Sequence, residues 1–445
     1  MSFHAQYAWV GGRIARDVLI EVTAGRFTAV TPGVRETSAA RLSGLVLPGL
    51  ANAHSHAFHR ALRGRTHGER GSFWTWRELM YSVAGSLDPN RYFALARAVY
   101  GEMALAGITC VGEFHYLHHG PDGTPYDDPN AMGGALIAAA AEAGIRITLL
   151  DTLYLTATVD GAPLSGVQRR FGDGDFDGWA TRVAALRPGA HARIGAALHS
   201  VRAVPAKLLG ELAGRSPLHL HLSEQRAENE RCLAVHGCTP TELLHRHGVL
   251  GPQTTAVHAT HLSDADIRRL GASGTGVCMC PTTERDLADG IGPARELASA
   301  GSRLSLGSDS HAVIDPFEEA RGLELDERLA TEQRGHFTSA ELLGAATNHA
   351  ALGWDDAGAI AVGRRADLVA VSLSSVRTAG SEPGQAIFAA TAADVTHVVA
   401  DGRLIVADAR HTGFDVPSAL RKALGMRERT ERSEGHEDMP KAGTA

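Results

Sequence analysis

Histidines recur at the ends of apolar, β-branched segments of this 445-residue chain. His54 and His56 end one such segment, and His219 and His221 lie in another that is followed by Glu224. Alternate residues of a strand point to the same face, so each pair can direct both imidazoles to one side. Neutral imidazole is a common zinc ligand, whereas an isolated His-x-His pair is more often only a polar strand end.

Polar residues follow other apolar segments in the same way. They are Glu113, His115, Tyr116, His199, Arg202, His258, His261, Asp309 and His311. Several neutral imidazoles with one carboxylate suit Zn²⁺ and leave a position open for water. Mg²⁺ and Ca²⁺ prefer mostly oxygen ligands. The residue types therefore predict a zinc site, provided that one fold brings these strand ends together.

Eight apolar segments carry these groups, and helical stretches rich in Ala and Leu lie between them. The segments are 45–56, 108–116, 145–155, 194–204, 218–224, 254–261, 276–280 and 304–309. Eight alternations of strand and helix are typical of an α/β fold of the (β/α)₈ TIM-barrel type. Active sites of such barrels lie at the carboxyl ends of the strands, which is where all of the polar groups fall.

The two ends of the chain have a different pattern, with short alternating strands separated by Gly pairs and Asp-Gly turns. We expect residues 1–48 and 357–425 to form one small β-sandwich domain beside a catalytic barrel of residues 49–356. Residues 426–445 are charged and polar, and we predict that they form a disordered tail.

Composition excludes several classes of protein. The 43 Lys and Arg against 50 Asp and Glu give a net charge of −7, which argues against a nucleic-acid or anionic-membrane binder. Five Cys are too few and too scattered for a disulfide framework. The longest apolar stretch, 131–141, is shorter than the roughly 20 residues that span a membrane. With no signal-peptide pattern at the N-terminus, we expect a cytoplasmic protein.

The order of these groups resembles the amidohydrolase superfamily: His-x-His after the first strand, His-x-x-Glu at the fifth, His at the sixth and Ser-Asp at the eighth. The segments SHAFHRALRG, SFWTWRELMY, EFHYLHH, HSVRAV, HLSEQ, HATH and GSDSH resemble, more narrowly, the formimidoylglutamate deiminases. That family releases ammonia from N-formimino-L-glutamate in histidine degradation. The likeness runs from about residue 45 to 355 and implies a barrel beside a β-sandwich, and a homodimer.

The resemblance implies a role for each residue at a matching position. The implied zinc ligands are His54, His56, His221 and Asp309. The implied catalytic residues are Glu224, His258 and, as a proton shuttle, Asp309. The implied substrate-binding residues are His59, Arg77, Tyr116, His199 and Arg202. One departure is visible, because the family usually has Gln at the position of His59.

We expect one Zn²⁺ per chain. Binuclear members of the superfamily bridge two metals with a modified Lys on an inner strand, and the barrel span here holds only Lys207, beyond the end of the fourth strand. Arg77 and Arg202 suit a dicarboxylate substrate, because guanidinium binds carboxylate through a rigid fork.

Two other functions stay open. A guanine-type deaminase could use the same barrel, but a purine site needs no pair of carboxylate-binding Arg residues. A scaffold could have kept the fold and lost the chemistry, and the complete set of expected ligands argues against it.

Overall fold

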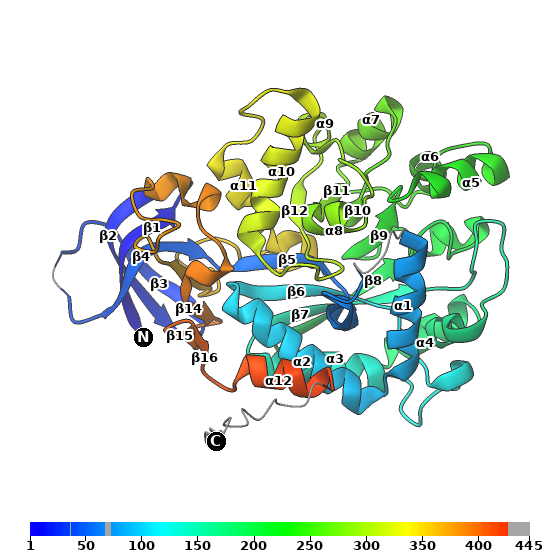
Figure 1. Ribbon diagram of the computed structural model, residues 1–445, viewed down its shortest axis with the longest axis horizontal. Helices are drawn as coiled ribbons and strands as arrows, with labels where there is room; N and C mark the ends of the chain where they lie inside the picture. Colours follow the sequence, from blue (N-terminus) through cyan, green and yellow to red (C-terminus); the bar gives the residue numbers. More distant parts are fainter. Residues whose placement is uncertain (36, 67–72, 426–445) are drawn as a thin grey trace, which may run out of the picture.

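A parallel sheet of eight strands forms the centre of the molecule (Figure 1). The computed structural model describes residues 1–35, 37–66 and 73–425. The strands, which are neighbours in chain order, are β5 (Leu50–Ser55), β6 (Ile108–His115), β7 (Arg146–Leu153), β8 (Ala192–Leu198), β9 (Leu218–Leu222), β10 (Thr254–His258), β11 (Gly276–Met279) and β12 (Leu304–Leu306). A bridge between Ser55 and Asp309 joins the first strand to the end of the last. The expected (β/α)₈ barrel is confirmed.

Helices lie in the crossovers between these strands and after the last of them, and they surround the barrel (Figure 1). They are α1 (Phe73–Ser86), α2 (Pro89–Leu105), α3 (Ala131–Ala143), α4 (Phe176–Ala184), α5 (Arg226–His236), α6 (Pro240–Arg246), α7 (Asp264–Ser273), α8 (Pro281–Asp286), α9 (Ala294–Ala300), α10 (Pro316–Thr331) and α11 (Ser339–Ala346). Two 3₁₀ segments, η3 (Gly166–Phe171) and η4 (Ala206–Leu212), lie in the crossovers after β7 and β8. In the described part of the chain, none of the helices combines the length and apolar character that crossing a bilayer requires.

Local sequence explains where several of these elements begin and end. Asp88 caps α2 by accepting the Arg91 N–H, and Pro89 occupies the first helical position, where its missing N–H costs nothing. Gly144 ends α3 with φ of 77°, a conformation that glycine adopts without steric cost. Every residue of β6 and β7 is buried, as expected for strands covered on both faces.

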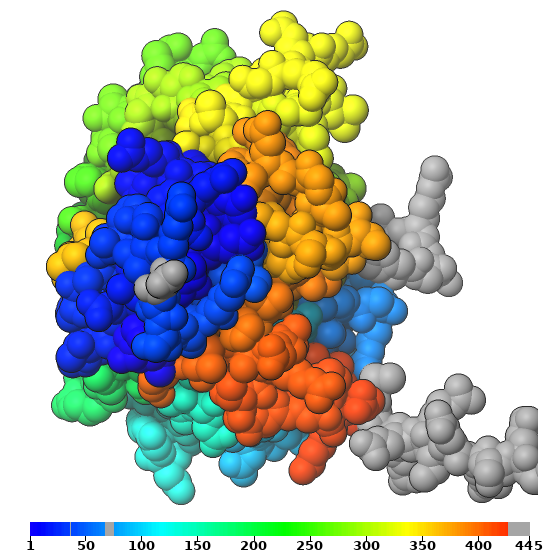
Figure 2. All heavy atoms as spheres, turned by 90° about the vertical axis from the view of Figure 1, so that its left-hand side faces the viewer, coloured from blue at the N-terminus to red at the C-terminus, as the bar shows by residue number. Residues whose placement is uncertain are grey.

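The second sheet combines strands from both ends of the chain. Its order is β16-β15-β14-β13-β4-β1-β2-β3. The strands are β1 (Ser2–Val10), β2 (Arg13–Thr23), β3 (Arg26–Thr31), β4 (Ala40–Pro48), β13 (Leu368–Val371), β14 (Val395–Ala400), β15 (Arg403–Ala407) and β16 (Arg410–His411). Figure 2 shows the N-terminal residues against the C-terminal ones on the same face of the molecule.

This sheet encloses a hydrophobic core of its own. Val18 of β2, Leu42 of β4 and Val399 of β14 belong to one buried cluster although their strands are not neighbours. Leu368 of β13 and Ala5 of β1, on the strands between them, belong to the same cluster, so one core joins strands from both ends of the chain, as expected for the small β domain. Helix α12 (Val416–Ala423) ends the described chain, and the tail predicted at 426–445 lies outside the described residues.

A buried ion pair connects the second sheet to the amino end of the barrel. Arg146, the first residue of β7, is 1% exposed and donates from Nη1 to Asp367 at 3.0 Å. Its Nη1 also lies 2.9 Å from Asp401 in the turn between β14 and β15. Burial alone would raise the pKa of Asp367, but the Arg146 guanidinium lowers it. Both groups are therefore charged, and each depends on the other for compensation.

We expect Arg146→Met to lower the free energy of unfolding by about 3–5 kcal/mol, because it leaves a buried carboxylate without its cationic partner. Arg26→Met is the control, since the Arg26–Asp356 pair is exposed and such pairs contribute about 0–1 kcal/mol. Urea unfolding followed by tryptophan fluorescence measures both. Equal losses in the two variants would contradict the role assigned to Arg146.

Candidate metal centre and active site

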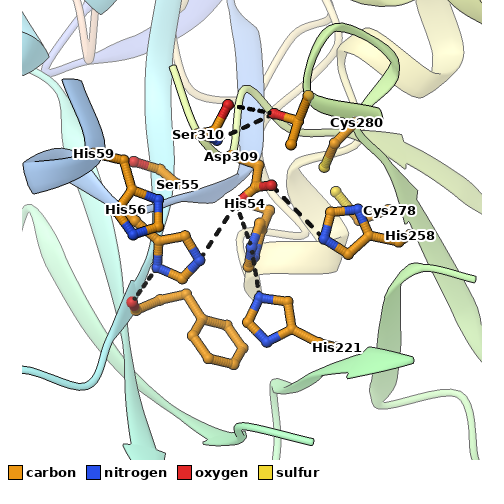
Figure 3. A network of polar contacts seen from close by, with 12 residues as sticks. His54, Ser55, His56, His59, His221, His258, Cys278, Cys280, Asp309 and Ser310 are labelled. Atoms are coloured by element: carbon orange, nitrogen blue, oxygen red, sulfur yellow. Dashed lines mark hydrogen bonds and ion pairs between the residues drawn. The ribbon is translucent and has the colours of Figure 1, made fainter. Parts of the chain in front are cut away.

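Four polar side chains converge at the carboxyl ends of the barrel strands (Figure 3). His54 comes from β5, His56 follows it, His221 comes from β9, and Asp309 follows β12. One donor atom of each lies within 4.8 Å of the other three. The Nε2 atoms of His54 and His56 are each 3.3 Å from Asp309 Oδ1. The structure thus brings all four expected zinc ligands together.

The backbone orients two of these imidazoles. Nδ1 of His56 donates to the Phe114 carbonyl at 2.9 Å, and Nδ1 of His221 donates to the His199 carbonyl at 2.8 Å. A carbonyl can only accept, so in each neutral ring the proton is on Nδ1 and the lone pair on Nε2. This arrangement, in which the other ring nitrogen is held by a hydrogen bond, is typical of metal-binding histidines.

The donor set fits a cation. Burial lowers the pKa of His54, His56 and His221, which keeps the three rings neutral. The Nε2 atoms of His54 and His221 lie only 3.2 Å apart beside a carboxylate. A positive ion among them would satisfy the converging electron pairs, and three imidazoles with one carboxylate match a zinc site better than a magnesium or calcium site.

Strained backbone surrounds this point. Ser223, His258, Asp309 and His311 have φ values of 50°, 68°, 36° and 58°, in the left-handed region that residues with side chains rarely adopt. All four lie just beyond a barrel strand or at its last residue. Such conformations cost on the order of 1–3 kcal/mol each and persist only where the surrounding structure holds them. Their clustering here indicates a functional site.

A buried carboxylate holds the turn that follows β5. Glu113 on β6 is fully buried and accepts hydrogen bonds from the Ser55 hydroxyl at 2.7 Å and from the Ala57 N–H at 2.6 Å. Ser55 Oγ also contacts His311 Nε2 at 3.0 Å. Burial raises the pKa of Glu113 to about 7. Glu113 and His311 therefore act from beneath the site and position the segment that carries His56.

The two residues expected to do proton chemistry lie beside the metal group. His258 Nε2 is 3.9 Å from Glu224 Oε1 and 3.7 Å from Asp309 Oδ2. Burial would lower the pKa of His258, but the surrounding carboxylates outweigh it and raise that pKa well above its usual value. Burial raises the pKa of Glu224 to about 7, which suits a group that exchanges protons at neutral pH.

Glu284 is a functional neighbour that sequence reasoning missed. It lies on α8, is 4% exposed, accepts the Cys280 N–H at 3.0 Å and places Oε1 3.4 Å from His258 Nδ1. The sequence feature that could have identified Glu284 is its position as a carboxylate shortly after the seventh strand. It holds the side of the His258 ring that faces away from Glu224.

A pocket of about 540 Å³ opens over the metal group. Ten of the eleven expected site residues line it, and these are His56, His59, Arg77, Tyr116, His199, Arg202, His221, Glu224, His258 and Asp309. His54 lies beneath them and is fully buried. Further lining residues that were not assigned from the sequence are Trp76, Met80, Tyr81, Tyr154, Phe171 and Leu287.

Two guanidinium groups give this pocket a positive region. Arg202 Nη1 lies 3.8 Å from Glu228 Oε2, and the guanidinium carbon of Arg77 lies 5.5 Å from the centre of the Tyr81 ring. Burial would lower the pKa of Arg202, but Glu228 and other neighbours raise it. Both side chains line the pocket, and guanidinium groups are suited to pairing with an anionic group of a ligand.

His59 occupies the wall between the metal group and the aromatic residues. Its Nε2 lies 3.1 Å from the Tyr116 hydroxyl, and its ring centre is 4.9 Å from that of Trp76. Burial lowers the pKa of His59 to about 3, so the ring is neutral. It can hydrogen-bond a ligand but adds no charge to the pocket.

A second group with metal-binding residue types, His115, His118 and Asp151, does not fit a cation. His118 Nδ1 contacts His115 Nε2 at 3.3 Å, and its Nε2 donates to the Thr152 carbonyl at 3.0 Å. Arg182 donates to both oxygens of Asp151 at 2.8 Å. Hydrogen bonds and a cationic side chain thus already satisfy this group.

Comparison with known proteins agrees with the geometry. Residues 45–405 match the model of the amidohydrolase family. The chain belongs to this family. Amidohydrolase membership agrees with the barrel, with the second sheet beside it and with the polar side chains that converge at the strand ends.

Three similar proteins are named as a deiminase, an amidohydrolase and a deaminase. Formimidoylglutamate deiminase of Pseudomonas aeruginosa is 37% identical over 90% of this chain and 93% of its own length. An amidohydrolase from Brucella melitensis of known crystal structure is 32% identical, with a TM-score of 0.86 over 95% of this chain and 99% of that one. An adenosine deaminase from Xanthomonas campestris, crystallised with bound zinc, is 25% identical, with a TM-score of 0.80 over 95% and 96%.

We expect His56→Ala and Asp309→Asn to lower zinc affinity by more than roughly 100-fold, because even loss of a group that hydrogen-bonds a metal ligand costs about 10- to 100-fold. Elemental analysis after dialysis against a weak chelator measures the bound zinc. His245→Gln, at an exposed histidine of α6, is the matched control. Parent-like zinc content in both variants would remove these residues from the metal centre.

Proposed function

We propose that this amidohydrolase is a zinc-dependent formimidoylglutamate deiminase, which hydrolyses N-formimino-L-glutamate to N-formyl-L-glutamate and ammonia in histidine degradation. The observation that carries the proposal is that Arg77 and Arg202 line the same pocket as the metal group. A linear dicarboxylate needs two cationic partners at one end of its site and a hydrolytic centre at the other. The 37% identity to the Pseudomonas aeruginosa deiminase supports the same substrate.

His54, His56, His221 and Asp309 would hold one zinc ion per chain. When bound, zinc would lower the pKa of a water molecule to about 7 and so supply a nucleophile at neutral pH. The rings of His56 and His221 need no reorientation for this role, because backbone carbonyls already fix them.

His258, Glu224 and Asp309 share the proton transfers. The His258 ring faces both carboxylates through Nε2, at 3.9 Å and 3.7 Å, so a proton on this nitrogen would lie near each of them. Glu224, whose pKa is raised to about 7, hydrogen-bonds the amidine nitrogens and can give a proton to the one that departs. Asp309 lies near the same nitrogen of the His258 ring, whereas Glu284 lies at Nδ1 on the other side of the ring.

Arg77 and Arg202 bind the two carboxylates of the substrate and direct its formimino group toward the metal group. The walls between these ends are formed by Tyr116, His199 and His59. Two parallel N–H···O bonds from each guanidinium would fix the direction of the substrate as well as its charge.

An alternative is deamination of a purine. The bound-zinc adenosine deaminase from Xanthomonas campestris shares this fold, and Trp76, Tyr116 and Tyr154 offer aromatic faces for a base. Ammonia release from N-formimino-L-glutamate, N-formimino-L-aspartate and guanine, assayed side by side, separates the two. Faster turnover of guanine would overturn the proposal, and protein purified without zinc and inactive on all three would favour a scaffold.

We expect Arg202→Met to lower kcat/KM for N-formimino-L-glutamate by about 10- to 150-fold, because a hydrogen bond to a charged group contributes about 1.5–3 kcal/mol. Steady-state kinetics on this substrate and on its side-chain amide measure the effect. Arg231→Met, at an exposed arginine of α5, is the matched control. If Arg202→Met discriminates between the acid and the amide as the parent does, Arg202 does not bind the side-chain carboxylate.

The same geometry predicts which carbon–nitrogen bond breaks. With both carboxylates bound by Arg77 and Arg202, the glutamate nitrogen is tethered away from the metal group. The terminal nitrogen can then approach Glu224 and Asp309 within the roughly 2.6–3.2 Å of proton transfer. In ¹⁸O-water we expect labelled N-formyl-L-glutamate and ammonia, identified by mass spectrometry. Labelled formamide with free L-glutamate would place the proton donor on the other side of the site.

A further inference from the structure

A hydrogen-bonded trio of Gln168, Tyr81 and Tyr154 forms part of the pocket wall. Tyr81 lies on α1, Tyr154 directly follows β7, and Gln168 lies on η3. Gln168 Nε2 donates to the Tyr81 hydroxyl at 3.2 Å and to the Tyr154 hydroxyl at 3.3 Å. Both tyrosines line the pocket, whereas Gln168 supports them from outside it and is 8% exposed.

The direction of these bonds determines what the tyrosines offer. An amide nitrogen carries two hydrogens, and Gln168 uses one for each hydroxyl oxygen. Each hydroxyl therefore accepts from Gln168 and keeps its own hydrogen for another acceptor. Burial raises the pKa of Tyr81 to about 12, so this hydroxyl stays protonated and remains a donor.

Both hydroxyls lie in the positive region of the pocket. Arg77 and Arg202 are close enough to Tyr81 to oppose the rise of its pKa. The Tyr154 ring lies 4.5 Å from that of His199, and Tyr154 in turn raises the pKa of Arg202. Two donors among two guanidiniums make a site for oxygen acceptors with negative charge, and a hydrogen bond to an ionised acceptor is about twice as strong as one to a neutral acceptor.

We propose that Gln168 is a positioning residue that orients the hydroxyls of Tyr81 and Tyr154 as donors to the substrate's carboxylate groups, and that this trio sets the preference for a dianionic substrate. The inference rests on the proposed function for the identity of that substrate. Gln168 touches no substrate atom and acts only through the two tyrosines.

Kinetics of Gln168→Met test this role. We expect KM for N-formimino-L-glutamate to rise about 5- to 20-fold while kcat stays within about threefold, because only binding of the carboxylate end is weakened. Gln333→Met, at an exposed glutamine, is the matched control. A fall in kcat with an unchanged KM would overturn the inference and indicate a merely structural role.

A double variant that lacks both tyrosine hydroxyls tests whether Gln168 acts through them. In Tyr81→Phe/Tyr154→Phe, the further change Gln168→Met should leave KM unchanged within about twofold, because nothing is left to orient. An undiminished effect of Gln168→Met in this double variant would overturn the inference.

Gln168→Glu keeps the shape of the side chain, but its carboxylate can only accept hydrogen bonds, so the tyrosine hydroxyls would donate to it instead. We expect its KM to exceed that of Gln168→Met, and a parent-like KM would overturn the assigned direction.

Binding of glutarate separates this inference from the proposed function. Isothermal titration of the zinc-loaded protein needs no turnover, and we expect glutarate to bind the parent more tightly than its monomethyl ester. Gln168→Met should reduce that difference in affinity several-fold.

A parent that is inactive on N-formimino-L-glutamate but binds glutarate more tightly than the ester, with the difference reduced in Gln168→Met, would contradict the proposed function alone. A parent that turns the substrate over while Gln168→Met keeps the parent KM would contradict the inference alone, and a parent that binds neither glutarate nor its ester would contradict both.

Discussion

Three neutral imidazoles and one carboxylate meet at a single buried point. Their converging electron pairs require a positive ion, and the rest of the site is arranged around this requirement. Backbone carbonyls hold the far nitrogens of His56 and His221, so their lone pairs turn inward. The Asp309 N–H donates to the His54 carbonyl at 3.0 Å, across the seam where the barrel closes. The candidate metal ligands His54 and Asp309 therefore also take part in barrel closure.

Much of the fold was predictable because its local signals are strong. All eight barrel strands and the small sheet from both termini follow from apolar segments, turns and strand alternation. Alternation alone does not distinguish His219 from His221, which share a strand face. Inward residues of a barrel stack in layers. His219 belongs to a deeper layer, where Nε2 donates to the Ala351 carbonyl at 2.8 Å, and His221 reaches the pocket.

The contacts that were not predicted from the sequence join segments that have no fixed spacing along the chain. Glu284 reaches His258 from α8, and Gln168 reaches Tyr81 from a different crossover. Neither pairing follows a periodicity of the sequence, because each depends on how segments from different parts of the chain pack over the strand ends. The positive φ of Asp309 is likewise invisible in the sequence, since Asp adopts it here only under the constraint of barrel closure.

Under the proposed function, the pocket has a hydrolytic end at the metal group and an anion-binding end at Arg77 and Arg202, so the chemistry and the substrate preference depend on different residues. Amidohydrolase folds support many substrates, so the metal group indicates the reaction, whereas Arg77, Arg202 and the tyrosine wall indicate the ligand.

X-ray absorption spectroscopy at the zinc edge tests the central claim most directly, because it reports the atoms around the metal in the loaded protein. The account predicts three imidazole nitrogens and a carboxylate oxygen at about 2.0–2.2 Å, and no second metal. Cys278 and Cys280 lie beside His258 (Figure 3), so a different ligand set is readily recognised. A sulfur neighbour at about 2.3 Å, or a second metal at about 3.5–4 Å, would contradict it.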